Sequence, residues 1–505
     1  MSELRTLWVP LAVTAFAIML LLVDVMSPPE SSRRSFGWLV AAALSIIFAG
    51  TFLIDGSGSA GHGVFVGGAW TVAFQRLFLA AGVVAALGGL DDVAKRTPMR
   101  VGEYWLAMLF SLVGMLLLPG ARELVFLIVS FELMGVPLYV LAAYAKTEKG
   151  AVTYPRPASG GSVEGKGFAA EAALKLYLTG ATSTAITLFG LALFTGMAGT
   201  TRLDAIGLTQ MTPLGAVGLA FVLAGMGYKL GMVPFHMWVP DTYEGASTPF
   251  VAFLSVAPKA AGVSAMSAVF IFGMGGQPSY WAPALGLIAL LSMAVGNFLA
   301  VPQTDLRRLL GYSGIAQMGY VLVAVAANDQ FSAAMTLFFL TAYVFTNMGA
   351  FLVVHAAAEA SGNHSFESLS GLAQRAPGLA ASMLAFLLSL AGIPFVIGFW
   401  AKLYVFLAAW RAGLVGLVFA GVVLAIVGLF YYLKVLQAAY MTEPGELRAP
   451  VLGAPLRLAI GICVLAVVGL GLWPRPLIDG SLAAAKSLYE KSPSAAIAPN
   501  VTAAR

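Results

Sequence analysis

The apolar runs of this chain are long and frequent enough to determine its fold class. A helix needs about 20 predominantly apolar residues to cross the hydrocarbon of a bilayer. Fourteen segments meet this requirement: 7–26, 36–55, 70–90, 101–119, 121–145, 168–195, 214–238, 247–273, 281–301, 308–327, 331–358, 379–411, 415–441 and 452–474. Backbone groups in lipid must bond within their own segment, and these runs are far too long for barrel strands. The sequence therefore predicts an all-α integral membrane protein with 14 transmembrane helices.

Composition excludes several classes of protein. Hydrophobic residues make up 60% of the chain and charged residues 10%, whereas a soluble domain has about 25% charged residues. The net charge of +5 is not gathered into a basic stripe beside aromatic residues, so no nucleic-acid partner is predicted. Cys463 is the only cysteine, which leaves no internal disulfide and no cysteine-based metal or iron–sulfur site. The chain has no phosphate-binding glycine loop and no pairing of its four histidines suited to haem, so we expect no metal and no cofactor within it.

The distribution of Lys and Arg predicts the orientation in the membrane. Loops after odd-numbered segments carry thirteen of these residues, and interior loops after even-numbered segments carry three. The positive-inside rule then places the odd loops in the cytoplasm and both termini on the periplasmic side. Segment 7–26 lacks a cleavage pattern and is read as a helix rather than a signal peptide. We expect a mobile cytoplasmic loop at 147–167 and a loosely ordered tail at 476–505.

Two segments carry helix-breaking residues in the same order. The seventh contains Lys229-Leu-Gly-Met-Val-Pro-Phe235, and the twelfth contains Leu390-Ala-Gly-Ile-Pro-Phe395. Proline and glycine both weaken a helix, and irregular backbone at membrane depth must be buried or line a wet cavity. The two Pro-Phe pairs are 160 residues and five segments apart, so a second copy would run inverted, as in many transporters. The alternative is that both prolines only kink their helices.

Five of the charged residues inside predicted spans stand out as functional candidates: Glu132, Lys175, Lys229, Lys259 and Lys402. An ion at the bilayer centre costs about 2.5–3.5 kcal/mol on insertion scales, so such residues are functional candidates. Glu132, Lys229 and Lys259 fall near the middle of their segments, whereas Lys175 is shallower.

Lysine and glutamate suit proton transfer. Burial lowers the pKa of a lysine, a nearby carboxylate raises it again, and arginine stays protonated throughout. Moving the carboxylate can therefore switch a lysine between holding and releasing a proton. Lys175, His236 and Lys434 are auxiliary candidates for the same path. The alternative is a set of static ion pairs, but one buried glutamate cannot neutralise four lysines.

Several motifs resemble one known family. They are Glu132-Leu-Met-Gly-Val-Pro137, Glu171-Ala-Ala-Leu-Lys175, the long run from Pro234 to Pro249, and Ser255-Val-Ala-Pro-Lys259. These stretches are similar to the antiporter-like subunit N family of respiratory complex I, the proton-pumping NADH:quinone oxidoreductase. Lysine at position 402 argues against sister subunit M, and the short C-terminal region argues against subunit L. Ser247 is a small departure, because a proline often stands there in the family.

The resemblance implies a fold and a division of the chain. It implies two inverted five-helix repeats with broken helices 7 and 12. Three N-terminal helices would occupy 1–100, the first repeat 101–275, the second 276–441, and helix 14 with the tail 442–505.

The resemblance also implies roles. Glu132 and Lys229 would form the modulating pair, Lys259 would connect the half-channels, and Lys402 would be the exit-side group. NADH, FMN, iron–sulfur clusters and quinone would belong to partner subunits. The partners would be antiporter-like subunit M and the small K-, J- and A-type subunits, in a bacterial inner membrane. A cation/proton antiporter remains the main alternative, because the fold is shared, and an organic-solute transporter is a weaker one.

Overall fold

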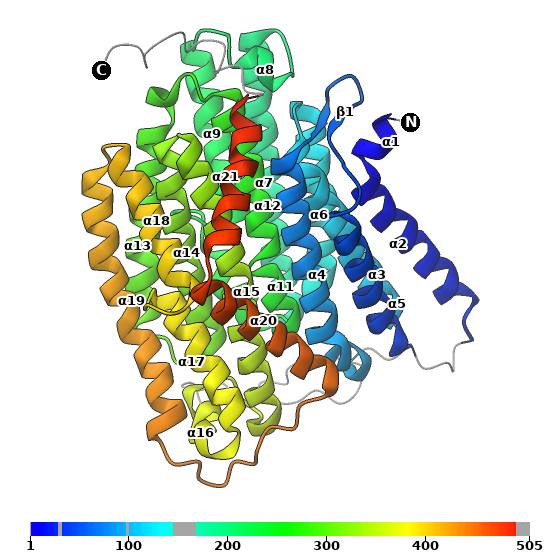
Figure 1. Ribbon diagram of the computed structural model, residues 1–505, viewed down its shortest axis with the longest axis vertical. Coiled ribbons are helices and arrows are strands. Elements are labelled where there is room, and N and C mark those ends of the chain that lie inside the picture. The colour runs from blue at the N-terminus through cyan, green and yellow to red at the C-terminus, as the bar shows by residue number, and fades with distance from the viewer. Residues whose placement is uncertain (1, 29–32, 97–99, 145–167, 491–505) are drawn as a thin grey trace.

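The computed structural model describes residues 2–28, 33–96, 100–144 and 168–490, which form a bundle of helices with one small β-hairpin (Figure 1). The N-terminal part contains α1 (Ser2–Thr6), α2 (Trp8–Met26), α3 (Ser35–Gly50), β1 (Gly58–Ala60), β2 (Phe65–Gly67), α4 (Ala69–Arg96), α5 (Val101–Leu117), η1 (Leu118–Gly120) and α6 (Leu124–Ala143). The middle part contains α7 (Phe168–Ala198), α8 (Leu203–Ile206), α9 (Pro213–Leu230), α10 (Trp238–Gly245), α11 (Thr248–Leu254), α12 (Ala257–Met266), the π-helical segment η2 (Ser267–Gly273), η3 (Pro278–Tyr280) and α13 (Ala282–Ala300). The last part contains α14 (Leu306–Ala327), α15 (Gln330–Ser361), η4 (Phe366–Leu369), α16 (Leu372–Arg375), α17 (Pro377–Ala391), α18 (Ile397–Arg411), α19 (Val415–Met441), α20 (Ala454–Leu472) and α21 (Arg475–Glu490).

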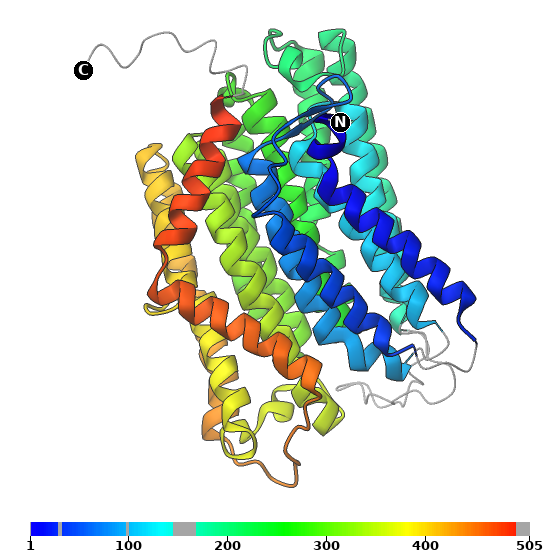
Figure 2. The ribbon, with the colours of Figure 1, turned by 45° about the vertical axis from the view of Figure 1, so that its right-hand side comes forward.

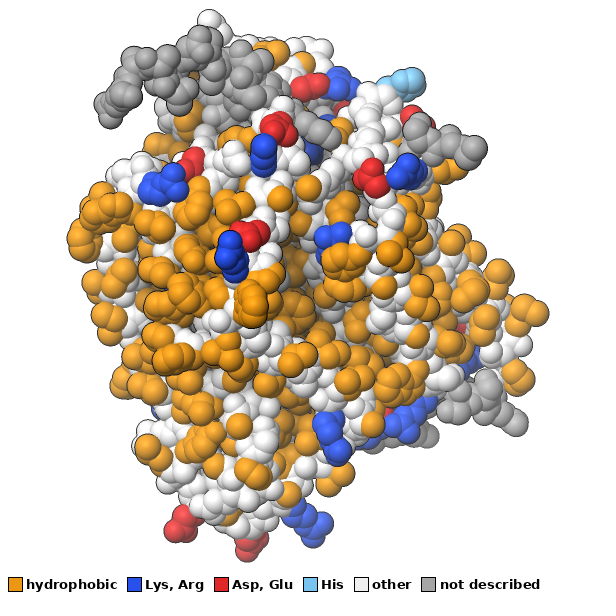
Figure 3. Space-filling view, in the orientation of Figure 1, with side chains coloured by type: hydrophobic (Ala, Val, Ile, Leu, Met, Phe, Trp, Pro, Cys, Tyr) orange, Lys and Arg blue, Asp and Glu red, His pale blue; other side chains and the backbone are white. Residues whose placement is uncertain are grey.

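The membrane prediction is confirmed in its main point. Within the described ranges, twelve helical segments are long and apolar enough to cross a membrane, and two shorter apolar helices, Ser35–Gly50 and Pro377–Ala391, accompany them. The count of exactly fourteen crossings and the inverted repeat stay predictions. The middle of the face shown in Figure 3 is covered by apolar side chains, while most charged side chains lie toward the two ends. Large exposed apolar residues such as Val423, Ile426 and Phe430 on α19 fit a lipid-facing belt.

Both predicted helix breaks are present. Helix α9 ends at Leu230, Gly231 takes the left-handed conformation with φ 67°, and α10 begins only at Trp238. Helix α17 ends at Ala391, Gly392 has φ 83°, and α18 begins at Ile397. Glycine tolerates this backbone shape without a Cβ penalty, so each break starts with a glycine cap.

A third interruption was not predicted. The segment 247–273 was expected to be one helix, but α11 ends at Leu254, α12 begins at Ala257, and the stretch after Met266 is π-helical. Pro258 stands in the first turn of α12, where it cannot donate a backbone hydrogen bond to the preceding turn. The break places Lys259 in the first turn of a helix rather than in its middle.

The expected loose tail at 476–505 is wrong for its first half. Residues 475–490 form helix α21, which packs against α4 and α15. The mean hydropathy of this segment is low, so it did not resemble a membrane-spanning helix, but one face is apolar and buries Ala484, Ala485 and Leu488. The remainder of the tail and the loop 147–167 lie outside the described residues. Helix α1 and the end of α21 lie at the same end of the bundle in both ribbon views (Figures 1 and 2).

Candidate functional site

Glu132 and Lys229 form an ion pair between α6 and α9. The Lys229 Nζ donates to Glu132 Oε1 at 3.1 Å and to the Tyr139 hydroxyl at 3.2 Å. The Thr184 hydroxyl on α7 donates to the same carboxylate oxygen at 2.6 Å. The lysine side chain is largely buried, whereas the Glu132 side chain remains 32% exposed. The carboxylate therefore connects a buried lysine to the outer surface of the bundle.

A small cavity lies beside this pair. Lys229, Tyr139, Thr179, Trp238 and Pro258 are among its lining residues, and its volume is about 40 Å³. A cavity needs only about 10–15 Å³ to hold one water when polar partners are present. There is room for more than one water between Lys229 and the turn that carries Lys259.

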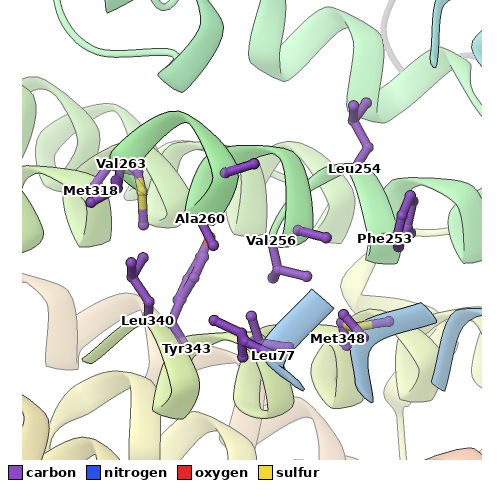
Figure 4. Packing of buried hydrophobic residues seen from close by; sticks show 14 of the residues in the cluster. Leu77, Phe253, Leu254, Val256, Ala260, Val263, Met318, Leu340, Tyr343 and Met348 are labelled. Atoms are coloured by element: carbon purple, nitrogen blue, oxygen red, sulfur yellow. The ribbon is translucent and has the colours of Figure 1, made fainter. Parts of the chain in front are cut away.

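Lys259 is the most completely buried of these charged residues, with 1% of its surface exposed. Its Nζ has no hydrogen-bond partner among the described residues, and neither has the hydroxyl of Tyr343 on α15. A Cβ placed on Gly314 would lie 3.2 Å from the Lys259 Nζ and 2.8 Å from the Tyr343 hydroxyl. Two unpaired polar groups thus face one point on α14, where only glycine leaves space. Figure 4 shows Ala260, the neighbour of Lys259, next to Tyr343 within an otherwise apolar core.

Lys402 is held by the end of another helix. It lies on α18, is 7% exposed, and its Nζ donates to the carbonyls of Leu390 at 2.7 Å and Ala391 at 3.2 Å. These are the last carbonyls of α17, which have no partner within their own helix and carry the negative end of the helix dipole. A second cavity of about 10 Å³, room for one water at most, is lined by Lys402 and Tyr343. Tyr343 therefore borders both the Lys259 and the Lys402 environments.

Lys175 belongs to a different group of charges. Its Nζ lies 2.6 Å from Asp241 Oδ2 and 2.9 Å from Glu171 Oε1. Arg308 on α14 donates to Asp241 at 2.8 Å and to Glu244 at 2.7 Å. The network joins α7, α10 and α14, which come from both halves of the chain.

This network corrects the argument about unpaired lysines. Lys175 is neutralised by carboxylates that the sequence analysis had not counted near it. Arg308, at the start of the predicted segment 308–327, lies in the first turn of α14. Asp241 and Glu244 lie in the Pro234–Pro249 motif, and these two acidic residues were the signal in the sequence that could have indicated partners for Lys175 and Arg308.

The remaining auxiliary candidates are His236 and Lys434. His236 is half-buried in the break between α9 and α10. Lys434 is exposed on α19, with its Nζ 4.9 Å from the centre of the Phe366 ring. Among the described residues, no hydrogen bond or ion pair joins Lys434 to the buried lysines. The other missed participants are Thr184 and Tyr343, whose types are too common in membrane helices to stand out.

Comparison with known proteins places the chain in a family. Residues 161–428 match the family described as NADH:quinone oxidoreductase/Mrp antiporter, TM. The NADH-quinone oxidoreductase subunit N of Moorella thermoacetica is 35% identical over 494 residues, which cover 97% of this chain and 100% of the relative. The chain belongs to the subunit N family of NADH-quinone oxidoreductases. The subunit N of Heliobacterium modesticaldum is 34% identical and covers 93% of this chain and 96% of its own.

Solved structures agree with the membership in this subunit N family. A chain of respiratory complex I from Thermus thermophilus with bound aureothin is 30% identical, with a TM-score of 0.78 over 94% of this chain and 99% of its own. A chain of the Mrp complex from a Dietzia species is 21% identical with a TM-score of 0.82 over 97% of this chain and 98% of its own, and so shows the shared fold alone. The matched region 161–428 contains the buried lysines but not Glu132 or Lys434.

Proposed function

We propose that this chain is a proton-translocating membrane-arm subunit of a respiratory NADH:quinone oxidoreductase. Redox chemistry would take place in partner subunits, and protons would move through Glu132, Lys229, Lys259 and Lys402 of this chain. The observation that carries the proposal is that Lys259, between two lysines with hydrogen-bond partners, has no hydrogen-bond partner among the described residues. An ion-pairing role alone would not leave the middle lysine unsatisfied at that depth.

The relay begins at the Glu132–Lys229 pair. Two unit charges 3 Å apart attract by about 5 kcal/mol at an effective dielectric of 20. Withdrawing the carboxylate removes this support from the ammonium, and the proton can pass to water in the adjoining cavity. Lys259 borders that cavity through Pro258, and Tyr343 leads on toward Lys402. Because the Glu132 side chain is partly exposed, a neighbouring charge can attract or repel its carboxylate and so start the first step.

The test compares two variants of the pair with an exposed control. We expect Lys229→Ala and Glu132→Ala to leave the complex assembled and to lower proton pumping sharply in reconstituted vesicles. Lys486→Ala on α21, whose side chain is 65% exposed, should pump normally. A full proton yield in both pair variants would refute the relay assignment.

The second candidate is a subunit of a multi-subunit cation/proton antiporter, favoured by the fold shared with the Mrp complex chain. Purification of the native assembly decides between the two. Flavin and iron–sulfur spectra together with NADH:quinone activity support the respiratory complex. Cation/proton exchange by a cofactor-free assembly supports the antiporter.

A further inference from the structure

A cluster of possible metal ligands lies away from the proton path, where α4 and α15 end. It consists of Asp92 on α4 with His355 and Glu359 on α15. Each residue offers one ligand atom, and the three atoms lie within 4.8 Å of one another. His355 and Glu359 are four residues apart, so both side chains project from the same face of α15. No proposed step of proton transfer uses any of the three.

Both carboxylates of the cluster are paired with cations of α4. Arg96 Nε donates to Asp92 at 2.6 Å, and Lys95 Nζ donates to Glu359 at 3.0 Å. His355 is 4% exposed, and a nitrogen of its ring lies within 4.8 Å of carboxylate oxygens of both Asp92 and Glu359. Because the ligand atoms of one imidazole and two carboxylates lie this close together, one ion could contact all three. Lys95 is 63% exposed on its side chain and is free to swing into water.

We propose that Asp92, His355 and Glu359 bind a divalent transition-metal ion of the zinc class. Zinc accepts both imidazole nitrogen and carboxylate oxygen as ligands, whereas magnesium and calcium prefer oxygen ligands only. Zinc holds such donors at about 2.0–2.2 Å in a tetrahedral arrangement, so two donors on one ion lie about 3.3–3.6 Å apart. Small side-chain rotations would close the present set around an ion, with water in the fourth position. The partly exposed Glu359 gives the ion a route from solvent.

Binding has a structural consequence. The ion takes the carboxylates from Lys95 and Arg96 and ties α4 directly to α15. Helix α15 also carries Tyr343 and Asn347, and Asn347 donates to Ser255 at the break before α12. If the proposed function holds, a bound ion slows coupled turnover by restraining α15. Binding itself does not depend on that function and is measured on the isolated chain.

The experiment is a zinc titration of the purified full-length chain, without a histidine tag, in detergent micelles. Calorimetry should give one Zn²⁺ per chain, and excess Mg²⁺ should not displace it. Loss of a residue that only supports a metal ligand already weakens metal binding by about 10- to 100-fold. His355→Gln and Glu359→Gln should therefore each weaken zinc binding by about tenfold or more. With Co²⁺ in place of Zn²⁺, the same two variants should lose the ligand-field absorption bands of the bound metal, in parallel with their loss of zinc affinity.

Three further variants make the result specific. His62→Asn and Glu367→Gln change exposed residues of the same types and should leave zinc binding unchanged. Asparagine suits the positive φ of His62. Lys95→Gln should tighten binding, because it removes the cation that competes for Glu359. Zinc affinity unaltered in the His355 and Glu359 variants, or ready displacement by Mg²⁺, would overturn the proposal.

Discussion

Thr184 offers the sharpest test of the Glu132–Lys229 pair, because its hydroxyl touches Glu132 without carrying a charge. The bond from Thr184 Oγ1 to the carboxylate is 2.6 Å long, and replacing Thr184 by valine keeps the shape while removing the donor. A hydrogen bond to a charged group contributes about 1.5–3 kcal/mol. Each 1.4 kcal/mol is a factor of ten, so the ionised carboxylate should become about tenfold or more less favourable. If Glu132 must cycle between charge states, coupled proton pumping should fall by a similar factor.

Thr182 provides the matched control on the same helix. Its hydroxyl is exposed and donates only to the Leu178 carbonyl, at 2.8 Å, whereas Thr184 also bonds its own backbone at Gly180. Thr182→Val therefore loses the backbone bond without touching Glu132. The assay is the initial rate of proton uptake by vesicles that contain the assembled complex, divided by the rate of NADH oxidation. Equal pumping by the two valine variants would refute the reasoning.

Three further predictions follow from single contacts. Lys402→Met should abolish coupled turnover yet leave thermal stability equal or higher, because a buried ion replaced by an apolar side chain of similar volume is neutral or stabilising by about 1–4 kcal/mol; lost stability with normal turnover would instead indicate a structural lysine. Gly314→Ala should lower turnover and cost about 1–3 kcal/mol, because its methyl would crowd Lys259 and Tyr343; unchanged vesicle pumping would argue against a role of Lys259 and Tyr343 at this point in proton transfer. Burial and then the charge of Arg307 lower the pKa of His364 to about 2, below the usual 6.5; the unfolded chain then binds the extra proton, so stability should fall as pH drops below about 6.5, and His364→Asn should flatten this slope in denaturation measured from pH 7 to 5.

The buried lysines and both helix breaks could be predicted from the sequence, because each contradicts its surroundings. A lysine in an apolar run, or a glycine followed within three residues by proline inside a span, is a local anomaly that needs no tertiary information. The break before Lys259 was missed although Pro258 is visible, because a proline in a membrane helix more often kinks than divides it. Helix α21 was missed because its signal is a one-sided apolar stripe rather than a continuous run.

The polar partners of the site could not be predicted because they are set by packing between distant segments. Thr184 and Glu132 are 52 residues apart, and Lys175 and Asp241 are 66 apart. Neither pair follows a helical spacing, so each depends on which helices lie side by side. The same limit applies to Asp92 and His355, which only the contact of α4 with α15 brings together.

The three buried lysines of the proposed relay differ in the sign of the helix end that lies beside each ammonium group. Lys229 lies in the last turn of α9, and Lys402 bonds the final carbonyls of α17, so both sit at negative helix ends. Lys259 lies in the first turn of α12, at a positive helix end, and has no hydrogen-bond partner among the described residues. A positive charge therefore has two supported positions with an unsupported one between them. In the proposed relay, Lys259 acts as a barrier that a proton crosses only when the Glu132–Lys229 pair is disturbed, which keeps protons from leaking through a resting subunit.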